Sequence, residues 1–191
     1  MNTKEAILSR RSCRKYSKKD VPKEIMDDII LAGRSAPTGL NRQNIKFYVI
    51  HNNSEKVKSI GLKVYENRVH AGKSGGWMDE IKEKLGIADP ILYEAPCMIA
   101  LVGDKNEYGI QSHMCDAGIA CQNIINMATY YGLGTVPVGV ANFLNQEAVL
   151  DGIGADKNKE DLLLVIPLGY PEDNWKDFVQ PKELTSFVKY V

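Results

Sequence analysis

The stretch Arg10-Arg11-Ser12-Cys13-Arg14-Lys15-Tyr16 decides how this chain is interpreted. It follows the apolar run Ala6-Ile7-Leu8, so the basic side chains begin where a short helix, expected over residues 3–11, comes to its end. Guanidinium groups match the geometry of phosphate with paired hydrogen bonds, and a hydroxyl adds one more donor. The stretch therefore predicts a site for a phosphate monoester with one cation left for a second task. A solvated basic face or a nucleic-acid arm has the same composition.

The composition is that of an ordinary globular protein. The chain has 191 residues, of which 44% are hydrophobic and 25% charged, which is enough for one domain with a core, taken here as residues 1–191. Lys plus Arg equals Asp plus Glu, so the net charge gives no sign of a polyanionic partner. Residues 1–24 hold eight basic and three acidic side chains, an excess of five. This imbalance indicates a local anion site, and we expect no nucleic acid partner.

The cysteines and the apolar runs bear on compartment. Cys13, Cys97, Cys115 and Cys121 form no CxxC pair, and His113 near Cys115 lacks the further ligands that zinc needs, so no metal site is expected. Free thiols are typical of a reducing compartment. No secretory signal and no run of about 18 apolar residues is present, so we expect a cytoplasmic protein that does not span a membrane.

Periodicity and turn residues divide the chain into helices and strands. Asp116 to Cys121, in the middle of the longest helix, is small and apolar on nearly every side and predicts a helix buried all round. Gly132 suits the position just after that helix. Gly72-Lys73-Ser74 lacks the full spacing of a phosphate loop. We expect helices over 3–11, from Pro22 to before Pro37, from Ser54 to before His70, and over 77–85, 110–131 and 146–150, and strands over 47–50, 97–102, 136–140 and 162–168, the first of them buried.

Four motifs in one order make the chain similar to a known family. Arg-Arg-Ser-x-Arg at 10–14 is followed by Ala-Pro-Thr-Gly-x-Asn-x-Gln at 36–43, by a helix ending in Gly-Leu-Gly at 132–134, and by Pro-Leu-Gly-Tyr-Pro at 167–171. Together they resemble the nitroreductase family of FMN-dependent oxidoreductases. The resemblance implies an α+β fold with a central mixed sheet flanked by helices and a long buried core helix. It also implies an intertwined homodimer with FMN at the subunit interface.

The resemblance also implies which residues bind the cofactor. Arg10, Arg11, Ser12 and Arg14 would bind FMN from one subunit, and by their chemistry Arg10 and Ser12 suit the phosphate. Arg14 suits the N1/O2 edge of the flavin, where negative charge grows as the ring is reduced. The remaining contacts would come from Pro37, Thr38, Gly39 and Asn41 of the other subunit and from Pro137, Val138 and Gly139.

Two segments depart from the family pattern. Gln43-Asn44-Ile45 stands where relatives have Gln-Pro-Trp, so an aromatic wall is missing. The tail segment 177–181 lacks the basic residues that help hold the phosphate in relatives, so either Lys176 or Lys182 substitutes or the phosphate rests on the N-terminal arginines alone. Residues 65–80, with Tyr65 and Trp77, are the expected lid of the pocket.

The activity implied by the resemblance is hydride transfer from NAD(P)H through flavin N5 to an electron-poor acceptor such as a nitroaromatic or a quinone. The flavin does the chemistry, so no catalytic side chain is nominated. A flavin-binding carrier or sensor without turnover is the alternative on the same fold. Two further hypotheses are nucleic-acid binding through residues 10–19 and a basic stretch that is merely solvated. Neither the acceptor nor a preference for NADH or NADPH follows from the sequence.

Overall fold

The described strands form one sheet that runs through the middle of the protein. The computed structural model describes residues 1–70, 76–105, 109–179 and 188–189. The strands lie in the order β1-β2-β4-β3, and each neighbouring pair is antiparallel. They comprise β1 (Ile45–Ile50), β2 (Cys97–Asp104), β3 (Gly134–Thr135) and β4 (Glu160–Gly169).

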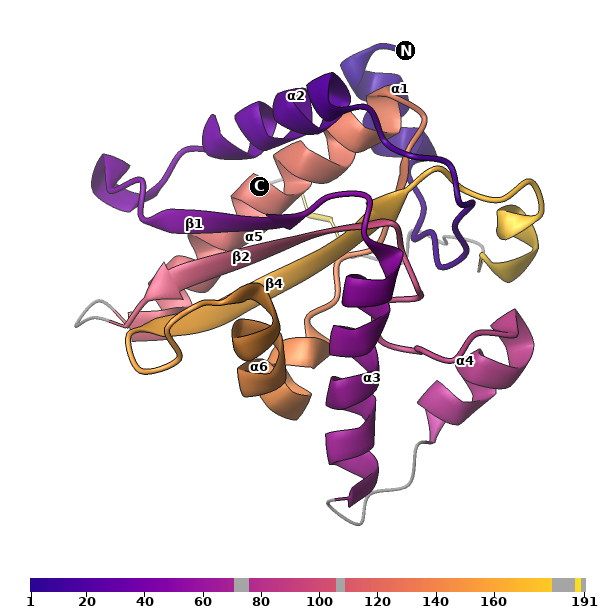
Figure 1. Cartoon of the computed structure of the whole chain (residues 1–191). Helices are drawn as coiled ribbons and strands as arrows, with labels where there is room; N and C mark the ends of the chain where they lie inside the picture. The colour runs from indigo at the N-terminus through magenta and orange to yellow at the C-terminus, as the bar shows by residue number, and fades with distance from the viewer. Residues whose placement is uncertain (71–75, 106–108, 180–187, 190–191) are drawn as a thin grey trace.

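Helices cover both faces of this sheet. One face carries α1 (Thr3–Ser9), α2 (Lys23–Arg34) and the long α5 (Gly109–Tyr130), and the other carries α3 (Ser54–His70) and α6 (Val140–Ile153) (Figure 1). Beyond α3 stands α4 (Trp77–Leu85), and short 3-10 turns occupy Gly39–Asn41 and Trp175–Phe178. The expected α+β class with a long core helix is confirmed. The expected mixed sheet is not what the named strands form, since the parallel pairing among the described residues is an isolated bridge between Ser12 and Thr135.

The alternation of β2 explains the two layers of core. Cys97, Ile99 and Leu101 pack in one cluster with α2 and α5, whereas Met98, Ala100 and Val102 pack in the other with α3 and α6. Successive side chains of a strand point to opposite faces, so a continuous apolar run is the signature of a strand covered on both sides. Residues 97–102, which the sequence predicted as a strand, are all fully buried.

Two strand predictions were wrong. The strand at 47–50 was expected to be buried, but β1 is an edge strand whose side chains are mostly half-buried or exposed. No regular strand forms over 136–140. The strand β3 lies just before this range, at Gly134–Thr135, and Val138 makes an isolated bridge to Val165. Pro137 has no N–H to donate to a ladder, which ends the regular pairing there.

The helices follow their sequence signals with two differences. The helix expected over 146–150 begins earlier, at Val140, but Asn145 is non-helical inside α6, and its Oδ1 accepts a hydrogen bond from the N–H of Ala148 at 3.0 Å, as a cap does. The centre of α5 is not buried all round in this chain. Gly118 is exposed and Ile119 is 38% exposed, on the side away from the sheet.

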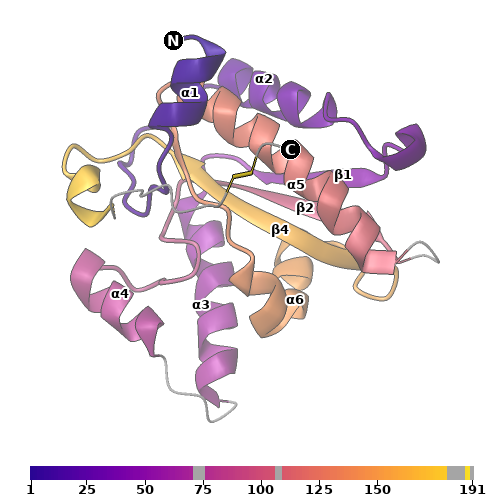
Figure 2. The ribbon, with the colours of Figure 1, turned by 180° about the vertical axis from the view of Figure 1, so that it is seen from behind.

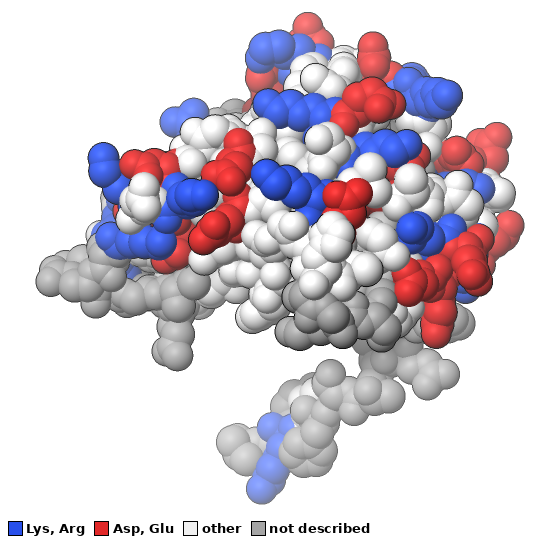
Figure 3. Space-filling view, turned by 60° about the horizontal axis from the view of Figure 1, so that its bottom comes forward, with Lys and Arg blue, Asp and Glu red and all other residues white. Residues whose placement is uncertain are grey.

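No helix within the described residues combines the length and apolarity that crossing a membrane requires. On the surface shown in Figure 3, lysine and arginine side chains are interspersed with aspartate and glutamate, in keeping with the balanced composition.

Candidate functional site

The segment carrying the basic stretch is fixed against the end of the sheet. We call residues 10–16 the arm. Its Cys13 N–H donates to the Thr135 carbonyl at 3.0 Å, and the hydroxyl of buried Tyr16 donates to the Cys13 carbonyl at 2.8 Å. Cys13 is fully buried, and burial raises the pKa of its thiol to about 11. These contacts bury Cys13 and Tyr16 and hold the backbone that carries the arginines.

The three arginines of the arm have different surroundings. Arg10 keeps one guanidinium nitrogen, Nη1, buried and without a hydrogen-bond partner among the described residues, and burial followed by repulsion from Arg11 lowers its pKa. Arg11 Nη1 donates to the carbonyls of Leu8 and Arg10, both at 2.8 Å, so this group closes the end of α1. Arg14 lies beside Tyr93, with Cζ 5.9 Å from the ring centroid. Arg10 therefore has a buried donor left for an anion.

Thr135 was missed by sequence reasoning. Its hydroxyl is buried and lacks a partner among the described residues, and its backbone is bridged to Ser12. An unsatisfied buried hydroxyl is costly, so a ligand placed against the arm would supply the hydrogen-bond partner that the Thr135 hydroxyl lacks. Only the topology brings Thr135 beside the arm, because 123 positions of the sequence separate it from Ser12 (135 − 12).

The second predicted segment, residues 36–43, forms a tight loop. Gly39 donates its N–H to the carboxylate Oδ1 of Asp116 in α5 at 3.1 Å. Thr38 Oγ1 accepts from the Gln43 N–H at 3.0 Å, and Asn41 Oδ1 accepts from Gln43 Nε2 at 3.1 Å. The loop thus uses two of its own predicted site side chains to hold its shape.

The loop also contains unusual backbone. Leu40, Asn41 and Gln43 all have positive φ, between 50° and 55°, and Leu40 is 90% exposed. Left-handed backbone is costly for residues other than glycine and clusters at functional sites. Asp116 anchors the loop from below while its other oxygen, Oδ2, is buried without a partner among the described residues.

The third predicted segment adjoins the arm. The Val138 N–H donates to the Val165 carbonyl at 2.8 Å and its side chain is buried, so this residue can offer only backbone to a ligand. Pro137 and Gly139 are half-buried, and Gly139 directly precedes α6.

The arm and the loop lie on opposite sides of the folded chain. The arm lies at the end of the sheet near Thr135 and the loop lies beyond the far end of α2, and both views of the ribbon agree on this separation (Figures 1 and 2). The structure therefore places the arm beside Thr135, which shortly precedes 137–139 in the chain, but does not bring residues 37–41 to the arm within one chain.

The expected lid and tail are only partly described. Residues 71–75, with the Gly-Lys-Ser run, and 180–187, with Lys182, lie outside the described residues. In the described part of the lid, the Tyr65 hydroxyl donates to Asp79, and Lys82 Nζ lies 4.6 Å from the Tyr65 ring centroid, so α4 is tied to α3. Lys176 is exposed in the last 3-10 turn.

Comparison with known proteins agrees with this geometry. The model of the "Nitroreductase family" matches residues 7–170. The chain belongs to the nitroreductase family. A nitroreductase with bound FMN from Desulfitobacterium hafniense superposes with a TM-score of 0.76 at 26% identity, covering 100% of this chain and 99% of that one.

Two sequence relatives of this nitroreductase-family chain have different names. A Methanothermobacter thermautotrophicus protein, provisionally named as an NADH dehydrogenase/NAD(P)H nitroreductase, is 28% identical over 91% of this chain and 80% of its own length. The iodotyrosine deiodinase of Hydra vulgaris is 29% identical over 88% of this chain. The match spans 65% of the length of the Hydra protein.

Proposed function

We propose that this protein is an FMN-dependent oxidoreductase that passes hydride from NAD(P)H to an electron-poor small molecule. The observation that carries the proposal is the buried Arg10 Nη1, which has no hydrogen-bond partner among the described residues and belongs to the segment that the family model matches. A buried guanidinium nitrogen without a hydrogen-bond partner is costly, and a phosphate would satisfy it with a charge-assisted bond.

The residues of the arm fit the cofactor. Arg10 and Ser12 would hold the phosphate, and the Thr135 hydroxyl, which lacks a partner within the described part of the chain, would add a donor next to Ser12. Arg11 binds the end of α1, so we assign it a supporting role in holding the arm. Because no arginine or lysine occupies 177–181, the phosphate would depend mainly on the arm.

Bound FMN supplies hydride acceptance and donation at N5, and the chain supplies position and charge. Arg14 would place a fixed cation at the N1/O2 edge of the ring, which stabilises the added negative charge of the reduced form. The half-buried backbone of Pro137 and Gly139 would line the ring without adding a titratable group. We assign no protein acid or nucleophile to the reaction.

We infer that the site is completed by a second copy of the chain. The loop with Pro37, Thr38, Gly39 and Asn41 lies too far from the arm of its own chain (Figure 2). A two-fold partner would bring its loop to that arm. The exposed face of α5 at Gly118 and Ile119 offers close helix packing for such a partner.

Two candidate activities differ in the molecule that accepts the hydride. Reduction of a nitroaromatic or a quinone is the first, in line with the name of the Methanothermobacter relative. Reductive dehalogenation of an iodinated tyrosine is the second, and the similarity to the Hydra deiodinase favours testing it.

The test is an absorption spectrum of the protein reconstituted with FMN, followed anaerobically after NADH or NADPH is added. We expect a yellow protein that bleaches within seconds and recovers its colour when an acceptor is supplied. A nitroaromatic, a quinone and diiodotyrosine are offered separately, with iodide release measured for the last. A yellow protein that does not bleach would indicate a flavin carrier or sensor, and a protein that retains no FMN would refute the proposal.

A further inference from the structure

A turn on the other side of Arg14 is built around a buried carboxylate. Asp89 is fully buried, and its Oδ1 accepts hydrogen bonds from the N–H groups of Ile91 at 2.9 Å and Leu92 at 3.1 Å. Its Oδ2 lies 3.5 Å from the N–H of Glu94. A single side chain therefore fixes the backbone of the whole turn between α4 and β2.

The turn holds Tyr93 in a conformation that tyrosine rarely adopts. Tyr93 and Glu94 have φ of 60° and 52°, in the left-handed region. Glu94 Oε1 accepts from the Ala88 N–H at 2.8 Å and pairs with Lys58 at 3.2 Å, which secures the end of the turn. Strained backbone of this kind persists only when its surroundings determine it, and it is concentrated at functional sites.

The packing above the turn requires glycine. A Cβ added to Gly61 in α3 would lie 2.2 Å from both carboxylate oxygens of Asp89, closer than any real contact of that kind. The helix can approach the carboxylate only because this residue has no side chain. The carboxylate is thus enclosed from above, and the turn has no room to relax toward α3.

What this turn presents to the arm is one side chain. Tyr93 is 6% exposed, its ring centroid lies 5.9 Å from Arg14 Cζ, and the Arg14 charge acts on its phenol group. Burial raises the pKa of Tyr93, with the Arg14 charge opposing that rise, so the phenol stays neutral beside the guanidinium. An arginine side chain otherwise has many rotamers, and contact with a fixed ring and hydroxyl removes most of them.

We propose that Tyr93 is a positioning residue that fixes the guanidinium of Arg14 against the flavin. This inference rests on the proposed function, in which Arg14 faces the N1/O2 edge of FMN. The buried ring excludes water from one side of the guanidinium, and a charge acts more strongly on its neighbour where water is excluded. Tyr93 thereby raises the reduction potential of the bound flavin without touching the reacting atoms.

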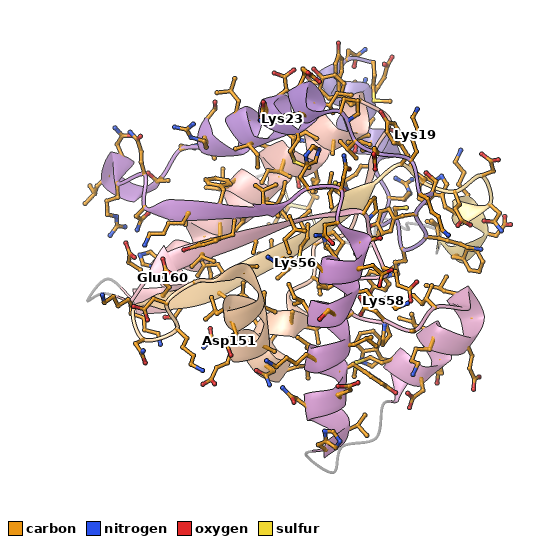
Figure 4. All side chains as sticks on the ribbon, viewed as in Figure 1. Lys19, Lys23, Lys56, Lys58, Asp151 and Glu160 are labelled. Atoms are coloured by element: carbon orange, nitrogen blue, oxygen red, sulfur yellow. The ribbon has the colours of Figure 1, made fainter. Side chains whose placement is uncertain are left out.

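The test compares the two-electron midpoint potential of bound FMN in the wild type and in Tyr93→Phe, which removes one oxygen and keeps the ring. We expect reduced FMN to lose about tenfold more affinity than oxidised FMN, so that the potential falls by about 30 mV. The matched control is Tyr48→Phe, which also removes one tyrosine hydroxyl. The Tyr48 hydroxyl donates to Glu160. Glu160 lies at the opposite end of the sheet from Lys19, which closely follows the arm (Figure 4). The control should leave the potential unchanged.

A double-mutant cycle tests whether Tyr93 acts through Arg14. In an Arg14→Lys background, Tyr93→Phe should change the potential by much less than it does in the wild type. An unchanged potential in Tyr93→Phe, or the same shift in both backgrounds, would overturn the inference. Thermal melts of all variants separate a positioning effect from loss of the fold, and Tyr93→Leu, which removes the ring as well, should give the larger shift. If the wild type itself retained no FMN, the proposed function would fail and not the role of Tyr93 alone.

Discussion

The substitution Gly134→Ala would disrupt the contact that joins the arm to the sheet. A Cβ at this position would lie 2.5 Å from Cys13 Cβ, 2.6 Å from Cys13 Sγ and 3.1 Å from Pro171 Cγ. Gly134 is paired with Gly169 in the sheet, so its backbone cannot easily retreat. The new methyl group would therefore push Cys13 and the arm away from Thr135.

The size of the effect follows from these distances. Nonbonded carbons rest about 3.5–4.0 Å apart, so Cys13 must move by about 1 Å. Overpacking of this kind costs about 1–3 kcal/mol, and a loss of about 2 kcal/mol lowers the Tm of a chain of this length by roughly 4–8 °C. The same displacement moves Arg10 and Ser12. Losing one hydrogen bond to a charged group, worth about 1.5–3 kcal/mol, weakens FMN binding by roughly 10- to 100-fold.

The assay pairs thermal melting with FMN titration, and Gly152→Ala is the matched control. A Cβ on Gly152 meets Ile60 Cγ1 at 2.5 Å, a clash of the same size between α6 and α3. We expect both variants to melt at lower temperature and only Gly134→Ala to bind FMN more weakly. Changing Cys13 to glycine in the Gly134→Ala background should recover part of the affinity. Wild-type affinity in Gly134→Ala, or an equal loss in both variants, would refute the role of the arm.

Four further outcomes follow from the same contacts. Arg10→Ala should weaken FMN binding by roughly 10- to 100-fold in a titration and leave riboflavin, which has no phosphate, nearly unaffected. Asp116→Ala should release the Gly39 N–H and lower FMN affinity with little change in Tm. Asp116→Asn keeps an acceptor oxygen and should retain much of the FMN affinity. Equal losses of affinity in the two variants would contradict the role of Asp116 as an anchor of the loop. Burial raises the pKa of Asp89 from 3.8 to about 6, so the folded protein keeps a proton that the unfolded chain releases, and this group should make the free energy of unfolding fall by about 3 kcal/mol as pH rises from about 4 to 6. Urea unfolding of the wild type relative to Asp89→Asn measures that slope, and parallel curves would contradict it. Gly118→Ala should weaken the dimer in sedimentation equilibrium, although a Cβ there meets nothing within 4 Å in one chain and would by itself stabilise the helix by about 1 kcal/mol.

The sequence was sufficient where a local pattern determines the structure. Residues 97–102, an entirely apolar run, were predicted as a strand, and β2 forms there, covered on both faces. Gly132 predicted a helix end, and its φ is positive. The helix at 77–85 was expected with the bounds that α4 has.

It was insufficient where the outcome depends on neighbours distant in the chain. Nothing local distinguishes β1, at the edge of the sheet, from a central strand, because Phe47 to Ile50 are apolar or aromatic in either case. The exposure of Gly118 and Ile119 likewise depends on what packs against α5.

The candidate site shows the same limit. The arm and the loop were identified from their motifs, but Thr135 and Asp116 carry no motif of their own and were found only through their contacts. Tyr93 becomes significant because Asp89 turns the chain back toward Arg14. Side chains that act through a neighbour have no signal in a single sequence.

Mixing two defective subunits tests the central claim most directly. Arg10→Ala/Ser12→Ala damages the arm and Thr38→Ala/Asn41→Ala damages the loop, so neither homodimer should retain FMN. A mixed dimer, isolated with different affinity tags, unites one intact arm with one intact loop. It should bind one FMN per two chains and bleach with NAD(P)H. A mixed dimer that binds no FMN would contradict a site shared between two copies of the chain.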